Sequence, residues 1–200
     1  MIGSAIALFA RLLTGATARW LGCTAEEGRR VYFANHSSNL DFVLLWAALP
    51  QCLRKHARPV AAHDYWTSNA LRRRLANDVF RAVLIERHNV SRENNPLEPM
   101  LTALRAGDSL IIFPEGTRNP TGEIGPFKPG IFHLARAIAD VEFVPVYIDN
   151  LNRVLPKGEV LPVPILCSVH FGMPLRLAAG EMKAAFLQRA RDAVLALKGS

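Results

Sequence analysis

The stretch of sequence that decides the fold is Val31-Tyr32-Phe33-Ala34-Asn35-His36-Ser37-Ser38-Asn39-Leu40-Asp41. Its apolar run, Val31–Ala34, predicts a short buried strand. The apolar periodicity of Leu40–Leu49 predicts a helix, which Pro50 ends because proline cannot continue a helix. The polar residues between strand and helix therefore lie in a tight turn. A strand that leads straight into a helix is typical of layered α/β proteins.

The same alternation of short apolar runs and helical periodicity continues along most of the chain. Strands are expected at residues 31–34, 59–62, 82–85, 109–113, 144–148 and 165–169. Helices are expected at residues 40–49, 70–80, 96–106, 131–138 and 179–197, the third of them between a cap at Asn95 and a stop at Gly107. We predict one α/β domain over residues 23–200, with a mixed, largely parallel sheet flanked by helices.

An amphipathic helix is expected before this domain, over residues 1–22. Its apolar residues follow one another at steps of three and four: Ile2, Ile6, Phe9, Leu13, Ala16 and Trp20. This spacing places them on one helical face, with Arg11 on the opposite side. Two interpretations are open: a helix in a membrane interface, or a helix packed on the protein's own core. We expect neither a secretory signal, because Arg11 interrupts the apolar part, nor a membrane-spanning helix, which needs ~20 apolar residues.

Composition excludes several classes of protein. Of 200 residues, 50% are hydrophobic and 20% are charged, which leaves enough apolar material for a core and excludes a disordered chain. The formal net charge is +7, and the basic excess lies in the first half of the chain, which predicts an anionic partner: phosphate, nucleic acid or acidic lipid. The cysteines Cys23, Cys52 and Cys167 are too widely spaced for a disulfide framework or a metal clip, and favour a reducing compartment.

Polar clusters follow three of the expected strands, at the ends where α/β sheets bind ligands. In the first cluster, His36 and Asp41 are five residues apart. If His36 lies in the turn and Asp41 in the first helical turn, the carboxylate reaches back to the imidazole. That contact fixes one tautomer and leaves the other ring nitrogen to accept a proton. Taken alone, the same residues also fit a simple capped turn.

The other two clusters carry side chains suited to an anion. In Phe113-Pro114-Glu115-Gly116-Thr117-Arg118, the glycine lets the backbone approach a ligand, and the threonine hydroxyl and planar guanidinium suit phosphate. Arg87 follows the strand at 82–85 and is expected to reach the same phosphate as Arg118. Taken alone, these clusters also fit a surface turn and a solvated ion pair.

Together the clusters resemble the sequence blocks of one family. Four blocks occur in order: Asn35-His36 through Asp41, Ile85-Glu86-Arg87, Phe113–Arg118 and Val144-Pro145-Val146. They resemble the glycerolipid acyltransferases, of the 1-acyl-sn-glycerol-3-phosphate acyltransferase type, which share a His-x4-Asp motif. Phe127-Lys128-Pro129-Gly130 also resembles the segment that follows the third block. One departure is Arg81, which stands where the second block commonly begins with glycine.

The resemblance implies an O-acyltransferase. Such an enzyme moves a fatty acyl group from acyl-CoA or acyl carrier protein to the free hydroxyl of a lysophospholipid. The expected acceptor is 1-acyl-sn-glycerol-3-phosphate and the product is phosphatidic acid. His36 would be the general base and Asp41 would orient it. Substrate binding would fall to Arg87, Glu115, Gly116, Thr117 and Arg118, with both arginines on the phosphate and Glu115 orienting an arginine or a glycerol hydroxyl.

The expected partners follow from that reaction. The acyl donor is a co-substrate, and neither a further cofactor nor a metal is expected. Because both substrates are amphiphiles, we expect a peripheral or monotopic protein on the cytoplasmic face of a membrane. The chain also contains a group of basic residues, Arg72-Arg73-Arg74 with Arg54, Lys55 and Arg58. This group would bind acidic lipid headgroups, attract an acidic acyl carrier, or form a solvated face. No nucleic-acid partner is expected, because no recognised motif appears.

Three alternatives stay open. The acceptor is another lysolipid, such as an acylated amino acid lipid; the protein binds phospholipid without catalysis; or it is a hydrolase in which His36 activates water on the thioester.

Overall fold

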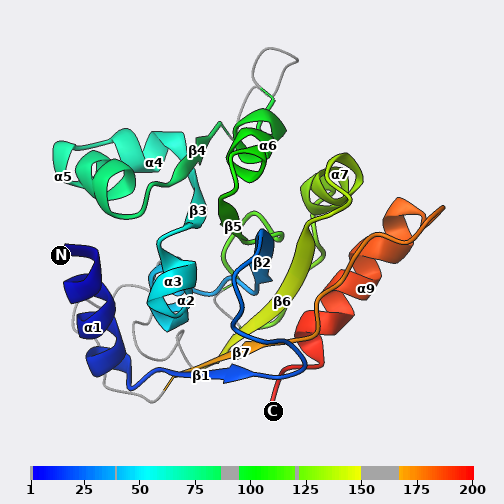
Figure 1. The fold of residues 1–200 in the computed structure, drawn as a ribbon, viewed down its shortest axis with the longest axis horizontal. Coiled ribbons are helices and arrows are strands. Elements are labelled where there is room, and N and C mark those ends of the chain that lie inside the picture. The colour runs from blue at the N-terminus through cyan, green and yellow to red at the C-terminus, as the bar shows by residue number, and fades with distance from the viewer. Residues whose placement is uncertain (1, 39, 87–94, 120–121, 150–166) are drawn as a thin grey trace.

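The fold is built on a central sheet. The computed structural model describes residues 2–38, 40–86, 95–119, 122–149 and 167–200. Within these residues, seven strands lie in the order β1-β7-β6-β2-β5-β3-β4 (Figure 1). Their bounds are β1 (Thr17–Trp20), β2 (Arg30–Ala34), β3 (Ala57–Ala62), β4 (Val83–Ile85), β5 (Ser109–Ile112), β6 (Glu142–Asp149) and β7 (Ser168–Phe171). Only the β6–β7 pair in this sheet is antiparallel, so the predicted mixed, largely parallel sheet is confirmed.

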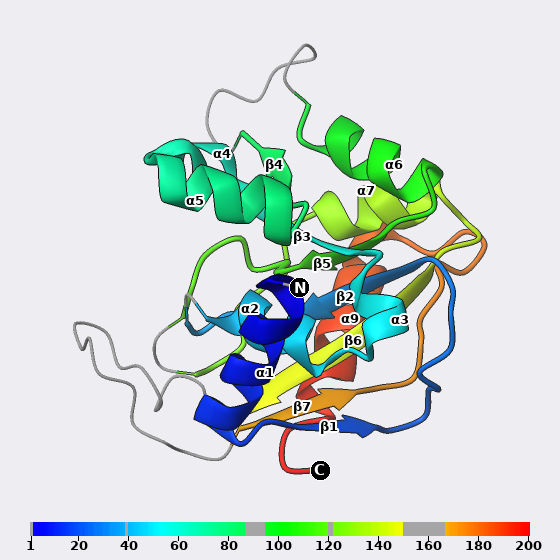
Figure 2. The same ribbon diagram turned by 60° about the vertical axis from the view of Figure 1, so that its left-hand side comes forward.

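Helices cover both faces of this sheet and make a three-layer arrangement (Figure 2). One face carries α6 (Leu97–Arg105), α7 (Gly130–Ala137) and α9 (Lys183–Leu195), and the other carries α1 (Ile2–Thr14), α2 (Asp41–Ala48) and α3 (Gln51–Arg54). Beside β3 and β4 lie α4 (His63–Thr67) and α5 (Ala70–Arg74), followed by the π-helical turn η1 (Leu75–Val79). The single helix predicted at 70–80 is therefore present in two parts.

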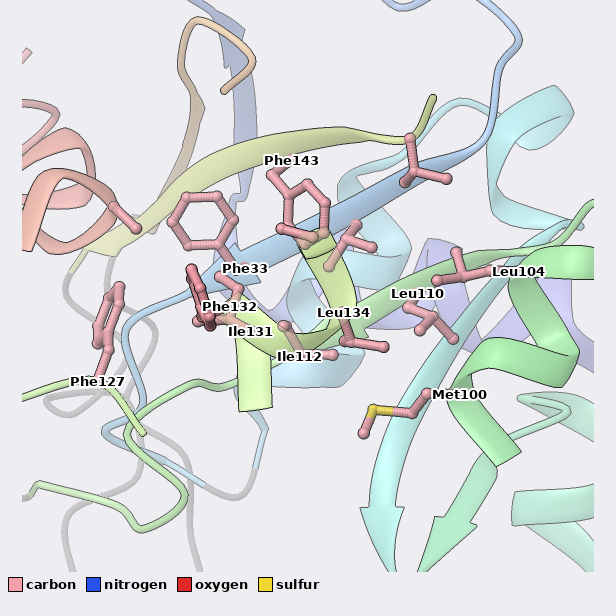
Figure 3. Close-up of a cluster of buried hydrophobic side chains, with 14 of the residues drawn as sticks. Phe33, Met100, Leu104, Leu110, Ile112, Phe127, Ile131, Phe132, Leu134 and Phe143 are labelled. Atoms are coloured by element: carbon pink, nitrogen blue, oxygen red, sulfur yellow. The ribbon is translucent and has the colours of Figure 1, made fainter. Parts of the chain in front are cut away.

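Each central strand contributes to two apolar cores. In β2, Val31 and Phe33 face one core, while Tyr32 and Ala34 face the other. Figure 3 shows the first core, where strand side chains meet those of α6 and α7: Phe33, Leu110, Ile112, Phe143, Met100, Leu104, Ile131, Phe132 and Leu134. Strands buried on both faces read as unbroken apolar runs, which is why the sequence pattern located them.

Helix α6 begins and ends at its predicted signals. The side-chain oxygen of Asn95 accepts a hydrogen bond from the N–H of Leu97 at 3.1 Å. Gly107, just beyond the helix, has φ of 91°, a left-handed conformation that glycine adopts without strain. Strand β5 starts two residues later, and its carboxyl end delivers the cluster at 113–118.

The N-terminal helix is shorter than predicted. Helix α1 ends at Thr14, and Gly15 follows with φ of 55°, a left-handed conformation that ends helices. Residues 17–20, expected on the helix, form β1 and pair with β7. Trp20 stacks on Phe171 with ring centroids 4.1 Å apart. The predicted helical stripe is wrong beyond Thr14, because the edge of β7 offers this segment hydrogen-bond partners.

Helix α1 packs several small residues against the core. Ala7 and Thr14 are buried, and a Cβ added to Gly3 would lie 3.2 Å from the ring of Trp46. Large apolar side chains point the other way: Leu8, Phe9 and Leu12 are 59%, 66% and 74% exposed. Phe9 was predicted on the same face as Ile6, but only Ile6 packs on the core.

Arg11 takes part in the packed side of α1. Its guanidinium donates hydrogen bonds to the carbonyls of Ala47 at 2.7 Å and Ala48 at 3.2 Å, at the end of α2. A cation there satisfies carbonyls that have no partner within the helix. Among the described residues no membrane-spanning helix is found, and the longest helices, α1 and α9, have 13 residues each.

Candidate active site

Two neighbouring strands bring the predicted polar clusters together. Strands β2 and β5 are parallel, with Phe33 opposite Ile112, so their carboxyl ends lie side by side. His36 follows Phe33 by three residues, and Glu115 follows Ile112 by three residues. The register therefore places His36 next to Glu115, at the end of a parallel sheet where ligands bind.

The predicted contact between His36 and Asp41 is present. Asp41 is the first residue of α2 and is fully buried, and its Oδ2 lies 2.7 Å from Nδ1 of His36. The same oxygen accepts hydrogen bonds from the N–H groups of Ser37 at 2.6 Å and Ser38 at 2.8 Å. The two serines thus lend their backbone to the carboxylate.

This contact sets the tautomer of His36. An ionised carboxylate only accepts hydrogen bonds, so Nδ1 carries the proton and donates it. Nε2 then holds a lone pair and is the ring nitrogen that accepts a proton. The His36 side chain is 18% exposed, which leaves part of the ring accessible to a substrate. The other oxygen of Asp41, Oδ1, is buried without a hydrogen-bond partner among the described residues, so the hydrogen bonds of this carboxylate are all made by Oδ2.

The segment after β5 holds His36 from the other side. The imidazole stacks on the ring of Phe113, with centroids 4.3 Å apart and planes 23° apart. The N–H of His36 donates to Oε1 of Glu115 at 3.0 Å, and its carbonyl accepts from the N–H of Asn119 at 2.7 Å. Ring and backbone of His36 are therefore both fixed by residues 113–119.

Glu115 lies differently from its predicted place. Its side chain is buried, and its second oxygen, Oε2, accepts a hydrogen bond from the N–H of Gly125 at 2.9 Å. A Cβ at Gly125 would lie 3.2 Å from that oxygen, so glycine allows the close approach. Among the described residues no ion pair joins Glu115 to an arginine. The carboxylate contacts two backbone N–H groups where a contact to arginine or substrate was expected.

The turn after Glu115 presents two cations. Gly116 has φ of 69°, and a Cβ on it would lie 2.7 Å from Nζ of Lys128, so the lysine side chain covers the glycine. Thr117, Arg118 and Lys128 are exposed. Neither Arg118 nor Lys128 forms an ion pair within the described parts of the chain. Lys128 is not among the site residues predicted from the sequence, although it lies in Phe127-Lys128-Pro129-Gly130, which resembles a family segment.

Arg87 lies outside the described residues, so its predicted contact with phosphate has no structural counterpart here. In the residue before it, Glu86, the carboxylate oxygen Oε1 lies 3.0 Å from Nδ1 of His63. These two side chains tie the end of β4 to the start of α4.

Asn35 has a role that the sequence did not reveal. Its side-chain amide donates to the carbonyl of Ile148 at 3.0 Å and accepts from the N–H of Ile148 at 2.8 Å. This pair continues the β2–β6 ladder by one step through a side chain. It fixes the residue immediately before His36.

One buried thiol lies near this region. Burial raises the pKa of Cys167 to about 11, and the negative charges of Asp149 and Asp41 add to the shift. The thiol therefore stays protonated at neutral pH and is a poor nucleophile.

Comparison with known proteins gives a consistent relationship. Residues 22–149 match the model of a family described as Acyltransferase. A 1-acyl-sn-glycerol-3-phosphate acyltransferase from Cocos nucifera is 26% identical over 179 residues, which cover 82% of this chain and 54% of that protein. The 1-acyl-sn-glycerol-3-phosphate acyltransferase alpha of Ovis aries is 32% identical over 131 residues, 64% of this chain and 43% of that protein. The chain thus spans about half the length of these curated relatives.

A solved structure shares the fold. The crystal structure of the 1-acyl-sn-glycerophosphate (LPA) acyltransferase PlsC from Thermotoga maritima matches 98% of this chain and 79% of its own, with a TM-score of 0.73 and 17% sequence identity. At that identity the likeness concerns the architecture, and it agrees with the three-layer arrangement around a largely parallel sheet.

Proposed function

The chain belongs to the acyltransferase family, and we propose that it transfers a fatty acyl group from acyl-CoA or acyl carrier protein to the free hydroxyl of a lysophospholipid. The proposed acceptor is 1-acyl-sn-glycerol-3-phosphate, and the product is phosphatidic acid. One observation carries the proposal. The imidazole of His36 is held at Nδ1 by Asp41 and lies beside a turn that exposes the cations Arg118 and Lys128.

The proposed chemistry is general base catalysis. Nε2 of His36 removes the proton of the acceptor hydroxyl while that oxygen attacks the thioester carbonyl, and Asp41 stabilises the imidazolium that forms. When the tetrahedral intermediate collapses, the C–S bond breaks and the imidazolium returns the proton to the leaving thiolate. Such proton transfer typically contributes ~10²–10⁴-fold to the rate. No acyl-enzyme is required, so neither Ser37 nor Ser38 acts as a nucleophile: both donate backbone N–H groups to Asp41, and Oγ of Ser38 accepts from the N–H of Leu40 at 3.3 Å.

The proposed acceptor site lies on the turn after β5. Arg118 and Lys128 would bind the phosphate together with Arg87, and Gly116 and Thr117 would line the approach. Each charge-assisted hydrogen bond to a phosphate is worth ~1.5–3 kcal/mol. The names of the relatives support 1-acyl-sn-glycerol-3-phosphate as the acceptor. Another lysolipid would use the same His36–Asp41 pair, so the choice of acceptor is a matter for a substrate panel.

The exposed face of α1 is the proposed membrane contact. Leu8, Phe9 and Leu12 present large apolar side chains to solvent, whereas Ala7 and Ala10 of the same helix pack on the core. Large apolar side chains on one outer face are typical of helices that lie in a bilayer interface. The arginines at 72–74 on α5 would add attraction to acidic headgroups, and we propose the cytoplasmic face as the site of association.

The test is an assay with radiolabelled acyl-CoA and 1-acyl-sn-glycerol-3-phosphate. The wild-type protein should form phosphatidic acid, and His36→Ala should not, because the proposed general base is removed. His133→Ala, on the far helix α7, is the matched control and should retain activity. Release of free fatty acid without acceptor acylation would indicate a hydrolase, and binding without turnover would indicate a lipid-binding protein.

The same assay should include acyl carrier protein as donor and a panel of acceptors. The panel consists of glycerol-3-phosphate, lysophosphatidylglycerol and an acylated amino acid lipid beside lysophosphatidate. Preference for a lipid without a phosphate monoester would contradict the proposed acceptor.

A further inference from the structure

The buried carboxylate of Glu115 is bound to main chain on both oxygens. Oε1 accepts from the N–H of His36 at 3.0 Å, and Oε2 accepts from the N–H of Gly125 at 2.9 Å. The residue is only 6% exposed. A substrate has little access to a side chain in this position.

The negative charge of Glu115 also argues against a contact with the substrate. A phosphate monoester and a carboxylate repel each other, and the exposed groups of this turn that suit a phosphate are the cations Arg118 and Lys128. A carboxylate that instead accepts hydrogen bonds from backbone N–H groups makes charge-assisted bonds, which are stronger than neutral ones. The position of Glu115 is therefore explained without a substrate contact.

His36 depends on this bond for its place. It lies two residues beyond the end of β2, where the strand no longer supplies partners for its backbone. The bond from its N–H to Glu115 and the bond from Asn119 to its carbonyl replace those partners. With Nδ1 held by Asp41 and the ring stacked on Phe113, these backbone bonds set how far the ring reaches from the sheet.

The same carboxylate closes the loop that follows it. The bond to Gly125 joins the start of the loop to a point ten residues on, and the N–H of Lys128 donates to the carbonyl of Pro114 at 2.8 Å. The loop that bears Arg118 is thus closed at Glu115. One side chain therefore links the general base to the proposed phosphate-binding turn.

From these contacts we propose that Glu115 is a positioning residue, which fixes the distance between Nε2 of His36 and the acceptor-binding turn and does not itself contact substrate. This inference rests on the proposed function. It assigns Glu115 a part in the chemical step, after both substrates are bound. A general base displaced by 1 Å loses about 100-fold in rate.

The test compares Glu115→Gln with wild type. The amide oxygen of glutamine replaces one acceptor, but its NH₂ group then faces the other backbone N–H, so the bridge is broken without a change of shape. We expect kcat to fall by about 100-fold while KM for the acceptor is unchanged within error. Glu98→Gln, at an exposed position on α6, is the matched control and should have wild-type kinetics.

A second variant separates charge from geometry. Glu115→Asp keeps the negative charge but is too short to reach both N–H groups, so it should lower kcat in the same way. If Glu115→Gln does not fold, this variant carries the test. An acceptor KM that rises while kcat is retained in either variant would show that Glu115 binds substrate and would overturn the proposal.

A third measurement does not depend on turnover: it is the rate at which the His36 imidazole is chemically modified. In both variants, diethyl pyrocarbonate should modify His36 faster than in wild type, as measured by mass spectrometry of the labelled peptide. The rate at His133 should not change. This experiment keeps its meaning if lysophosphatidate is not the acceptor. Equal rates of modification at His36 in wild type and variants would overturn the positioning role.

Discussion

The guanidinium of Arg81 lies 3.2 Å from Oδ2 of Asp108, although the backbone of Arg81 has φ of 50°. Residues other than glycine are strained in that left-handed region. Asp108 is buried and also binds Arg58 at 3.3 Å, and Nε of Arg58 donates to the carbonyl of Arg81 at 2.6 Å. The ion pair thus holds a strained turn that leads into β4. Glycine adopts a φ of 50° without strain, which accounts for the glycine that commonly begins the second block of the family.

This arrangement predicts that glycine at position 81 gives a more stable protein than alanine, the reverse of the usual order. Both Arg81→Ala and Arg81→Gly lose the ion pair, but only glycine adopts φ of 50° without strain. Arg81→Ala should therefore be less stable than Arg81→Gly by about 1 kcal/mol, in contrast to most sites. Urea unfolding followed by circular dichroism measures the difference. Equal stability of the two variants would mean that the backbone at 81 is not strained.

The Asp41 carboxylate is expected to matter through its charge. In Asp41→Asn the amide oxygen still accepts from Nδ1 of His36, but the negative charge that stabilises the imidazolium is gone, and the NH₂ group takes the buried Oδ1 position without a partner. We expect kcat to fall by ~10²–10⁴-fold. The unpaired NH₂ should lower the free energy of unfolding by ~1–3 kcal/mol. Steady-state kinetics and thermal unfolding test both effects, and a kcat near that of wild type would contradict the role of the pair.

The cations after β5 are expected to act on the acceptor alone. Arg118→Ala and Lys128→Ala should each raise KM for lysophosphatidate about tenfold, which corresponds to the loss of one charge-assisted bond. KM for the acyl donor should not change. Arg176→Ala serves as an exposed control away from the turn. If only the donor's KM changes, the phosphate is not bound at this turn.

The outer face of α1 is expected to determine membrane binding. Replacing Leu8, Phe9 and Leu12 together by serine should lower the partition coefficient onto phosphatidylglycerol-containing vesicles at least about tenfold, because three exposed apolar side chains no longer enter the interface. The fold should persist, since these side chains do not pack on the core. Serine at Met173 and Met182, which are 69% and 75% exposed, is the matched control. Unchanged co-sedimentation of the triple variant would transfer the role to another surface.

The cysteines should react in order of exposure and pKa. At pH 8, Cys52, which is exposed, should react with a thiol reagent first, whereas Cys167 should stay unmodified because it is buried and its pKa is raised to about 11. Unfolding releases this thiol to its usual pKa of 9.0. The unfolded state therefore loses the proton first, so the contribution to stability is present below pH 9 and is lost as pH rises toward 11. Peptide mapping after brief labelling checks the order, and early modification of Cys167 would contradict its burial.

Much of this architecture could be predicted because the central strands are buried on both faces. Such strands leave unbroken apolar runs, and the polar residues at their carboxyl ends marked the site. The contact of His36 with Asp41 followed from a turn and the first residue of a helix, both local features.

What could not be predicted depends on distant partners. Strand β1 consists of Thr17-Ala18-Arg19-Trp20, with neither an apolar run nor alternation, and it exists because β7, about 150 residues later, supplies hydrogen bonds. The place of Glu115 was missed for a similar reason. A glutamate beside an arginine reads as a surface charge, and only the packed loop reveals that its partners are backbone N–H groups of His36 and Gly125.

The parallel register of β2 and β5 fixes the position of His36 relative to Glu115. Both functional side chains stand the same three positions past the facing residues Phe33 and Ile112. Inserting a single alanine between Ile112 and Glu115 would leave every strand and every core residue in place, yet it would turn the carboxylate away from its target. The number of residues between each of these strands and the group it carries is therefore part of the geometry of the site.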